Sequence, residues 1–157
     1  EDLPSVREIY THYVLNSSVT FDEQPLTLVE LRRKFAVGEK LSMPFLVADS
    51  PRGQLLGVAW VYPWQGRTRQ RRSVEISIYL GPAATGKGLG RVLLERLLAD
   101  ARTAGIRDAI AVIADKGADA SIRMHKNLGF REIGRMGKVG YKYDRWLGTV
   151  LLQKVLR

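Results

Sequence analysis

The chain has 157 residues and a net charge of +9 at pH 7, with 45% hydrophobic and 26% charged residues. This composition is ordinary for a soluble globular protein, and the length fits one domain, residues 1–157, with a substantial core. The sequence contains no cysteine, which excludes disulfides, cysteine-ligated metal and a cysteine nucleophile. With two histidines, no apolar run near ~20 residues and no signal-peptide pattern, we expect a cytoplasmic protein without metal or membrane span.

The first half of the chain predicts two helices and a β-hairpin. Apolar spacing and turn residues predict helices over residues 4–15 and 27–37, and strands over residues 44–49 and 54–64. Thr27 and Glu30 have the spacing of a capping box at the start of the second helix. Gly38 is expected to end that helix.

The second half predicts two strand–helix units followed by a pair of strands. Strands are expected over residues 74–80 and 108–114, helices from about Leu89 to Ala101 and over residues 118–129, and terminal strands over residues 131–140 and 146–156. The residues of 108–114 are almost all apolar, which is typical of a strand buried on both faces. Together these elements predict an α/β (α+β) fold, a mixed central sheet with helices on both faces.

A glycine-rich turn joins the predicted strand 74–80 to the following helix. It contains Gly86, Gly88 and Gly90, with Lys87 and Arg91 between and after them. Glycines allow close approach of a bulky anion, and the free N–H groups and positive dipole of a helix N-terminus attract phosphate. The alternative is a tight turn that needs glycines only for its geometry. The spacing fits neither the P-loop nor the dinucleotide fingerprint, which favours another pyrophosphate-bearing ligand.

The densest basic cluster lies just before the predicted strand 74–80, in the sequence RTRQRR, residues 67–72. It could be a solvated loop, a site for an acidic small molecule, or a nucleic-acid contact. Nucleic acid is the least favoured of these because aromatic residues are not interleaved with the arginines.

Several stretches, taken in order, resemble the GNAT N-acetyltransferases and, among them, the phosphinothricin and methionine sulfoximine acetyltransferase branch. They are SSVTFDEQPLT, PFLVA, GVAWVYPWQGR, SVEISIYLGP, TGKGLG, AVIA, SIRMHKNLGF and GYKYDRW. The glycine loop alone is a weak motif, but the ordered set is specific and extends from Ile9 to Leu151. The resemblance implies the GNAT fold and direct acetyl transfer from acetyl-CoA to a primary amine in a ternary complex.

The resemblance also implies which residues form the site. Glu75 and His125 match the catalytic base and the general acid. Acetyl-CoA would contact Ile78, Tyr79, Leu80, Gly86, Lys87, Gly88, Leu89, Gly90 and Arg91, with the backbone N–H groups of Ile78 and Leu80 on the thioester and pantetheine arm. The acceptor would contact Phe21, Arg67 and Arg71.

The two catalytic assignments each have a structural alternative. Glu75 is the only acidic residue between Asp49 and Glu95, and its apolar and basic surroundings could raise its pKa through desolvation. It could instead be a carboxylate paired with a nearby arginine. His125 could be a half-buried histidine on a helix face, packed through its neighbours.

The sequence departs from the branch at Thr85, Ala118, Gln70, Tyr143 and Gly148, of which the last two stand where the branch often has His and Asp. Acetyl transfer to a small amino-acid-like amine is therefore the prediction, with the identity of that amine left open. Alternatives are a polyamine, an aminoglycoside or a protein N-terminus as acceptor, or a non-catalytic module that binds acyl-CoA or nucleic acid. The resemblance further implies a homodimer.

Overall fold

The computed structural model describes Pro4 and residues 28–52, 54–64, 72–81, 88–115, 118–142 and 145–156; for Leu28 and residues 138–142 and 145–147 it describes the backbone alone. In these ranges the helices are α2 (Leu28–Lys40), α3 (Leu89–Thr103) and α4 (Asp119–Asn127), and the strands are β1 (Phe45–Asp49), β2 (Leu55–Pro63), β3 (Ser73–Leu80), β4 (Asp108–Ala114), β5 (Arg131–Lys142) and β6 (Arg145–Val155). The predicted helix 4–15 lies, apart from Pro4, outside the described residues.

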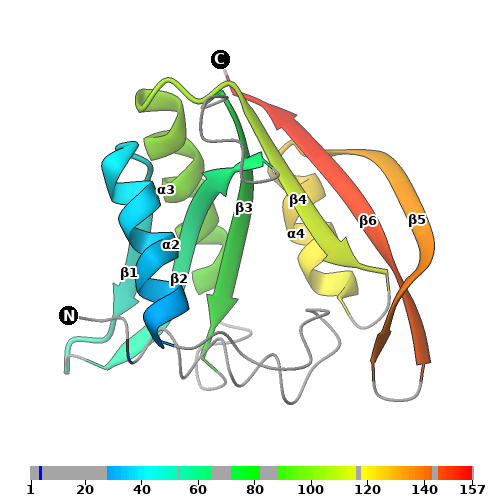
Figure 1. The fold of residues 1–157 in the computed structure, drawn as a ribbon, viewed down its shortest axis with the longest axis horizontal. Helices are drawn as coiled ribbons and strands as arrows, with labels where there is room; N and C mark the ends of the chain where they lie inside the picture. Colours follow the sequence, from blue (N-terminus) through cyan, green and yellow to red (C-terminus); the bar gives the residue numbers. More distant parts are fainter. Residues whose placement is uncertain are drawn as a thin grey trace.

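The six strands form one mixed sheet in the order β1-β2-β3-β4-β6-β5 (Figure 1). β1 and β2 pair antiparallel as the predicted hairpin, and β3 pairs antiparallel with β2 and parallel with β4. β6 lies antiparallel between β4 and β5. The predicted mixed sheet is therefore confirmed. β5 continues past the predicted residue 140 to Lys142, whereas β6 has the predicted length and begins and ends one residue earlier than the sequence suggested.

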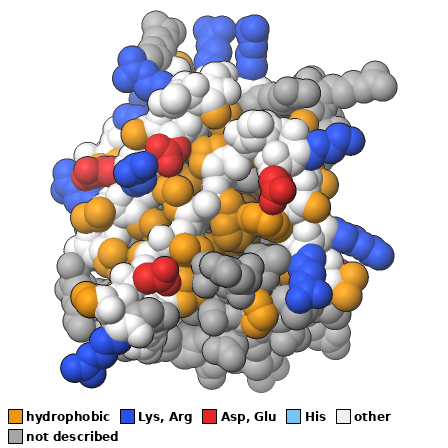
Figure 2. All heavy atoms as spheres, turned by 90° about the vertical axis from the view of Figure 1, so that its left-hand side faces the viewer, with side chains coloured by type: hydrophobic (Ala, Val, Ile, Leu, Met, Phe, Trp, Pro, Cys, Tyr) orange, Lys and Arg blue, Asp and Glu red, His pale blue; other side chains and the backbone are white. Residues whose placement is uncertain are grey.

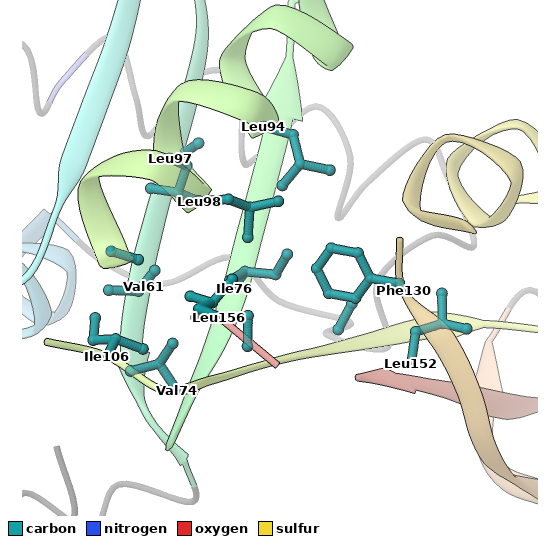
Figure 3. Packing of buried hydrophobic residues seen from close by; sticks show 14 of the residues in the cluster. Val61, Val74, Ile76, Leu94, Leu97, Leu98, Ile106, Phe130, Leu152 and Leu156 are labelled. Atoms are coloured by element: carbon teal, nitrogen blue, oxygen red, sulfur yellow. The ribbon is translucent and has the colours of Figure 1, made fainter. Parts of the chain in front are cut away.

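The helices cover both faces of the sheet, because alternate residues of a strand point to opposite sides. On one face, Leu31 of α2 packs against Val58 and Trp60 of β2. On the other face, α3 packs its buried leucines against residues of β2, β3 and β4, including Ala59 and Val61. Figure 3 shows this larger core, in which Leu94, Leu97 and Leu98 face Ile76, Phe130 and Leu152. Ile122 and Met124 of α4, and Leu128 directly after it, pack at its margin.

The prediction that Gly38 ends the second helix is wrong. α2 continues through Gly38 to Lys40, because one glycine lowers helix propensity by only about 1 kcal/mol. The helix ends where Ser42 adopts a left-handed φ of 56°. The N–H of Met43 then donates to the carbonyl of Gly38 at 2.8 Å, which satisfies one of the last helical acceptors.

β1 forms one edge of the described sheet. Figure 2 views the molecule from this side and shows hydrophobic atoms at the centre, with Lys and Arg side chains projecting around the rim. None of the helices in the described ranges is both long and apolar enough to cross a membrane.

Candidate active site

The sheet opens between β3 and β4. These strands are paired only at residues 73–75 with residues 108–110. Both continue beyond the last pair, β3 to Leu80 and β4 to Ala114, and Figure 1 shows them separating as they do so. The backbone groups on the facing sides of the two strands therefore have no partner in the other strand beyond Glu75 of β3 and Ile110 of β4.

Two hydrogen bonds identify the backbone groups that border this opening. The N–H of Gly81 donates to β2 at 2.7 Å, and the carbonyl of Arg72 accepts from the N–H of Asp108 on β4 at 2.9 Å. Successive peptide groups of a strand point to opposite sides, so the odd-numbered residues of β3 face β2 and the even-numbered ones face β4. The N–H groups of Ile78 and Leu80 consequently point into the opening.

A cavity of about 80 Å³ lies at the opening, lined by residues 75–79 of β3, residues 111–113 of β4, and Ser121 and His125 of α4. This volume holds a few water-sized groups, so it suits a small acyl group and its neighbouring atoms. The alternation of β3 directs Glu75 towards the α2 face, where Tyr79 packs, whereas His125 enters from the α3 and α4 face. Glu75 and His125 thus reach one opening from opposite faces of the sheet.

Glu75 is a largely buried carboxylate at the last residue pair between β3 and β4. Burial raises the pKa of the Glu75 carboxyl above its usual range, and the positive charge of Lys34 on α2 partly lowers the pKa again. A carboxylate with a raised pKa is a stronger base than an exposed one. The alternative of an arginine ion pair finds no support in the described residues, whose salt bridges all lie elsewhere.

His125 is only 2% exposed. Its Nδ1 lies 2.7 Å from the carbonyl oxygen of Ser121, which can only accept, so Nδ1 carries the proton and Nε2 keeps a free lone pair. Burial lowers the pKa of the imidazole, and the hydrogen bond to Ser121 partly raises it. The ring also makes an edge contact with Phe130, with centroids 5.1 Å apart. His125 is therefore neutral and fixed in one orientation at neutral pH.

The first N–H groups of α3 have no acceptor within the helix. Gly88 is the N-cap, with a left-handed φ of 75° and no side-chain cap, and its carbonyl accepts from Val92 at 3.3 Å. The N–H groups of Leu89, Gly90 and Arg91 precede this bond and have no acceptor within the helix. They lie at the positive end of the helix dipole, which favours a negatively charged group.

The start of α3 is packed against the opening. A Cβ at Gly90 would lie 3.3 Å from Leu80 at the end of β3 and 3.3 Å from Met124 on α4. Glycine therefore allows the helix to approach both elements closely. The guanidinium of Arg91 is engaged by Glu95 at 2.8 Å, so part of the positive charge expected here is balanced.

The structure brings most of the predicted site residues together. Glu75, Ile78, Tyr79 and His125 line one cavity, and Leu80 contacts the start of α3. The predicted site residues Phe21, Arg67, Arg71, Gly86 and Lys87 lie outside the described residues, as do Gln70, Thr85 and Tyr143. Ala118 is buried at the N-cap of α4 without a side-chain cap.

Gly148 occupies a place in β6 where no side chain fits. Its N–H donates to Oδ1 of Asp115 at 2.9 Å, and a Cβ there would lie 2.6 Å from Oδ2 of the same carboxylate. The Asp115 carboxylate therefore fills the space that a side chain at position 148 would take.

The sequence did not point to Lys34, whose ammonium influences Glu75. One signal was available, since Lys34 follows the buried Leu31 by three positions and residues at that spacing share a helix face. Lysine is rare on the inner face of an amphipathic helix, so this position could have been identified as a candidate site residue.

The pattern of the family described as "Acetyltransferase (GNAT) family" matches residues 6–130. The chain belongs to this family. Among its relatives is a phosphinothricin N-acetyltransferase of Alcaligenes faecalis, 37% identical over 156 residues that cover 99% of this chain and 79% of the relative. An L-methionine sulfoximine/L-methionine sulfone acetyltransferase of Pseudomonas paraeruginosa is 36% identical over 152 residues, 97% of this chain and 88% of the relative.

Solved structures of other GNAT proteins superpose closely on this one. A phosphinothricin acetyltransferase from Sinorhizobium meliloti in complex with acetyl-CoA matches with a TM-score of 0.91 and 40% identity, covering 99% of this chain and 83% of the other. A putative acetyltransferase from Salmonella typhimurium with its cofactor acetyl-CoA matches with a TM-score of 0.92 and 35% identity, covering 99% and 89%. This GNAT protein is accordingly an enzyme of the acyltransferase class, an N-acetyltransferase.

Proposed function

We propose that this GNAT enzyme transfers acetyl from acetyl-CoA to the primary amine of a small amino-acid-like acceptor, by direct attack in a ternary complex. The observation that carries the proposal is the opening between β3 and β4, which Glu75 and His125 line from opposite faces of the sheet. Two substrates can meet there, one from each side. The sequence has no cysteine to form a cysteinyl acyl-enzyme.

The described residues fit acetyl-CoA at two points. The N–H groups of Leu89, Gly90 and Arg91 at the start of α3 would bind the pyrophosphate, together with the proposed contacts of Gly86, Lys87 and Gly88. The N–H groups of Ile78 and Leu80 would bind the thioester and the pantetheine arm, with Tyr79 beside them. Acetyl-CoA supplies the acetyl group as a thioester, whose carbonyl becomes more electrophilic when an N–H group polarises its oxygen.

Glu75 would remove the proton that an amine must lose before or during attack. Its raised pKa suits this role, because a base with a pKa closer to neutrality accepts a proton more readily. Glu75 lies on the α2 face, so the acceptor amine would approach from that side, and the proton could pass directly or through one water.

His125 would return a proton to the departing thiolate on the other face. In the resting enzyme Nδ1 holds the only ring proton and donates it to Ser121. The proton that His125 hands over from Nε2 must therefore be acquired during the cycle. An acceptor that enters as an ammonium ion releases two protons in total, of which one reaches the thiolate and one is released to solvent.

The acceptor class rests on the relatives and on charge. The relatives act on phosphinothricin and on methionine sulfoximine or sulfone, as their names state. Phe21, Arg67 and Arg71 would form the acceptor pocket, in which guanidinium groups suit an acidic substrate. A polyamine or an aminoglycoside would be repelled by the same arginines. The proposal includes a cytoplasmic homodimer.

The test is thiol release from acetyl-CoA across a panel of amines. The panel contains phosphinothricin, methionine sulfoximine and sulfone, common amino acids, spermidine, an aminoglycoside and a short peptide. We expect turnover with amino-acid analogues that is lost in Arg71→Ala. Turnover confined to spermidine, the aminoglycoside or the peptide would contradict the acceptor class. A lack of turnover with acetyl-CoA still bound would instead favour an acyl-CoA-binding module.

A further inference from the structure

Lys34 lies over an aromatic surface on the α2 face of the sheet. Its Nζ is 4.9 Å from the ring centroid of Tyr62 and 6.0 Å from that of Trp60. Phe45 stacks on Trp60 at 5.5 Å with an interplanar angle of 9°, and Trp60 contacts Tyr79 at 5.5 Å. Aromatic faces attract a cation and replace part of its water shell, so the ammonium has a defined position.

That position is beside the catalytic opening. In the register of β2 and β3, Tyr62 is the residue directly opposite Glu75, and neighbouring strands are about 4.8 Å apart. Side chains of paired residues lie on the same face of a sheet. The Lys34 ammonium over Tyr62 and the Glu75 carboxylate are therefore adjacent on the face from which the acceptor would approach.

The ammonium forms no direct ion pair within the described part of the chain. No carboxylate there lies within 4.0 Å of its Nζ. Its positive charge nevertheless acts on Glu75, whose pKa it lowers. An anionic group placed between the aromatic surface and Lys34 would gain a charge-assisted contact.

We infer that Lys34 is a specificity-determining residue that receives the acidic group of the acceptor while the amine of the same molecule faces Glu75. This inference rests on the proposed function. An α-amino acid carries its amine and carboxylate on one carbon, so it can span the short distance between Glu75 and Lys34. The proposed arginine contacts would then hold the acceptor's other polar end.

The experiment compares one acceptor with and without its negative charge. L-Methionine sulfone and its methyl ester are assayed with the wild type, Lys34→Met and Lys34→Arg by thiol release from acetyl-CoA. Lys34→Met keeps a flexible side chain on the aromatic rings and removes the charge, whereas Lys34→Arg retains the charge. Both acceptors use the same base, so any change in Glu75 cancels in the ratio of their kcat/KM values.

We expect the wild type to have a higher kcat/KM for the acid than for the ester. In Lys34→Met the acid-to-ester ratio of kcat/KM should fall by about 10- to 100-fold, the loss expected for a contact to a charged group. Lys34→Arg should keep most of it, and the KM for acetyl-CoA should stay unchanged in both variants. Circular dichroism and thermal melting establish that each variant is folded.

The outcomes separate this inference from the proposed function. If the wild type acetylates the acid and Lys34→Met shows the same acid-to-ester ratio, the inference is overturned and the function stands. Turnover of spermidine without turnover of either sulfone overturns both. If nothing turns over, calorimetric binding of the two sulfones to the CoA-loaded protein decides, and equal affinity of the acid for wild type and Lys34→Met overturns the inference.

Discussion

The ammonium of Lys154 on β6 donates a hydrogen bond of 2.7 Å to the carbonyl oxygen of Leu128, the residue that follows α4. A cation at this end of a helix satisfies a terminal acceptor and opposes the negative end of the dipole. The N–H of Phe130 also bonds the carbonyl of His125 at 3.0 Å. The end of α4, whose last turn carries His125, is therefore tied to β6 through Lys154 and closed locally by the N–H of Phe130.

We expect Lys154→Met to lower the free energy of unfolding by about 1–2 kcal/mol, the value of a hydrogen bond to a charged group. It should also reduce kcat more than the KM for acetyl-CoA, because His125 loses its support. Urea unfolding and steady-state kinetics measure the two effects. The control is Lys126→Met, which removes a solvent-exposed ion pair to Glu132 and should change stability by less than about 0.5 kcal/mol. Equal effects of both variants would refute the role given to Lys154.

Gly129 and Gly105 form a matched pair for substitution by alanine. Both have a positive φ, 96° and 86°, so alanine is strained at each by about 1–2 kcal/mol. A Cβ at Gly129 would also lie 2.5 Å from Nζ of Lys154, whereas nothing lies within 4 Å of one at Gly105. We expect Gly129→Ala to lower the Tm more than Gly105→Ala. The additional loss of Tm in Gly129→Ala should disappear when both alanine substitutions are made in the Lys154→Met variant, which lacks the Nζ atom.

Glu75→Gln should lower kcat by at least about 100-fold, the contribution of a general base, and at the same time raise the Tm at pH 8. The folded-state pKa of Glu75 is raised by burial, so between pH 4.5 and that pKa the native protein holds more protons than the unfolded chain. The contribution of Glu75 to the free energy of unfolding therefore falls as pH rises. Glutamine does not ionise, so the variant does not lose this stability. The gain in Tm should shrink towards pH 4.5.

The control for Glu75 is Glu132→Gln, since Glu132 is an exposed carboxylate paired with Arg135. This variant should have wild-type kcat and no higher Tm at pH 8. If Glu75→Gln has a lower Tm than the wild type at pH 8, the ionised Glu75 is stabilised by its partners rather than destabilised by burial.

His125 should make the enzyme sensitive to mild acid. Its folded-state pKa lies below the usual 6.5, so below pH 6.5 the unfolded chain takes up a proton that the native chain resists. The stability present above pH 6.5 is consequently lost as pH falls through the folded pKa. We expect the Tm of His125→Gln to depend less on pH between about 6.5 and 5 than that of the wild type. Parallel curves for the two proteins would contradict this.

The sequence predicted the strands and helices well where their signals are local. The apolar run of β4 and the glycines after α3 and α4 mark elements whose boundaries the structure confirms within a residue or two. The end of α2 was missed because the terminator is Ser42, which has no strong preference for a left-handed φ, while Gly38 lies in the helix.

The sequence named residues that lie at one opening, but it did not predict their arrangement around it. Glu75 and His125 stand out by type and position in the sequence, yet their approach from opposite faces depends on where the β3–β4 pairing stops. Lys34 comes near Glu75 only through the packing of α2 on β2 and the register of β2 with β3. Long-range packing of that kind leaves no local pattern in a single sequence.

Only three residue pairs join β3 to β4. The sheet therefore consists of two parts, β1–β3 and β4–β6, that are connected along a short stretch of backbone pairing. A donor substrate lying in the opening would pair with β3 as a neighbouring strand does, accepting hydrogen bonds from the N–H groups of Ile78 and Leu80. A ligand that binds only the folded chain adds RT ln(1 + [L]/Kd) to its stability. The cellular supply of that substrate would then set two quantities together: how fast the enzyme works and how long each molecule survives proteolysis.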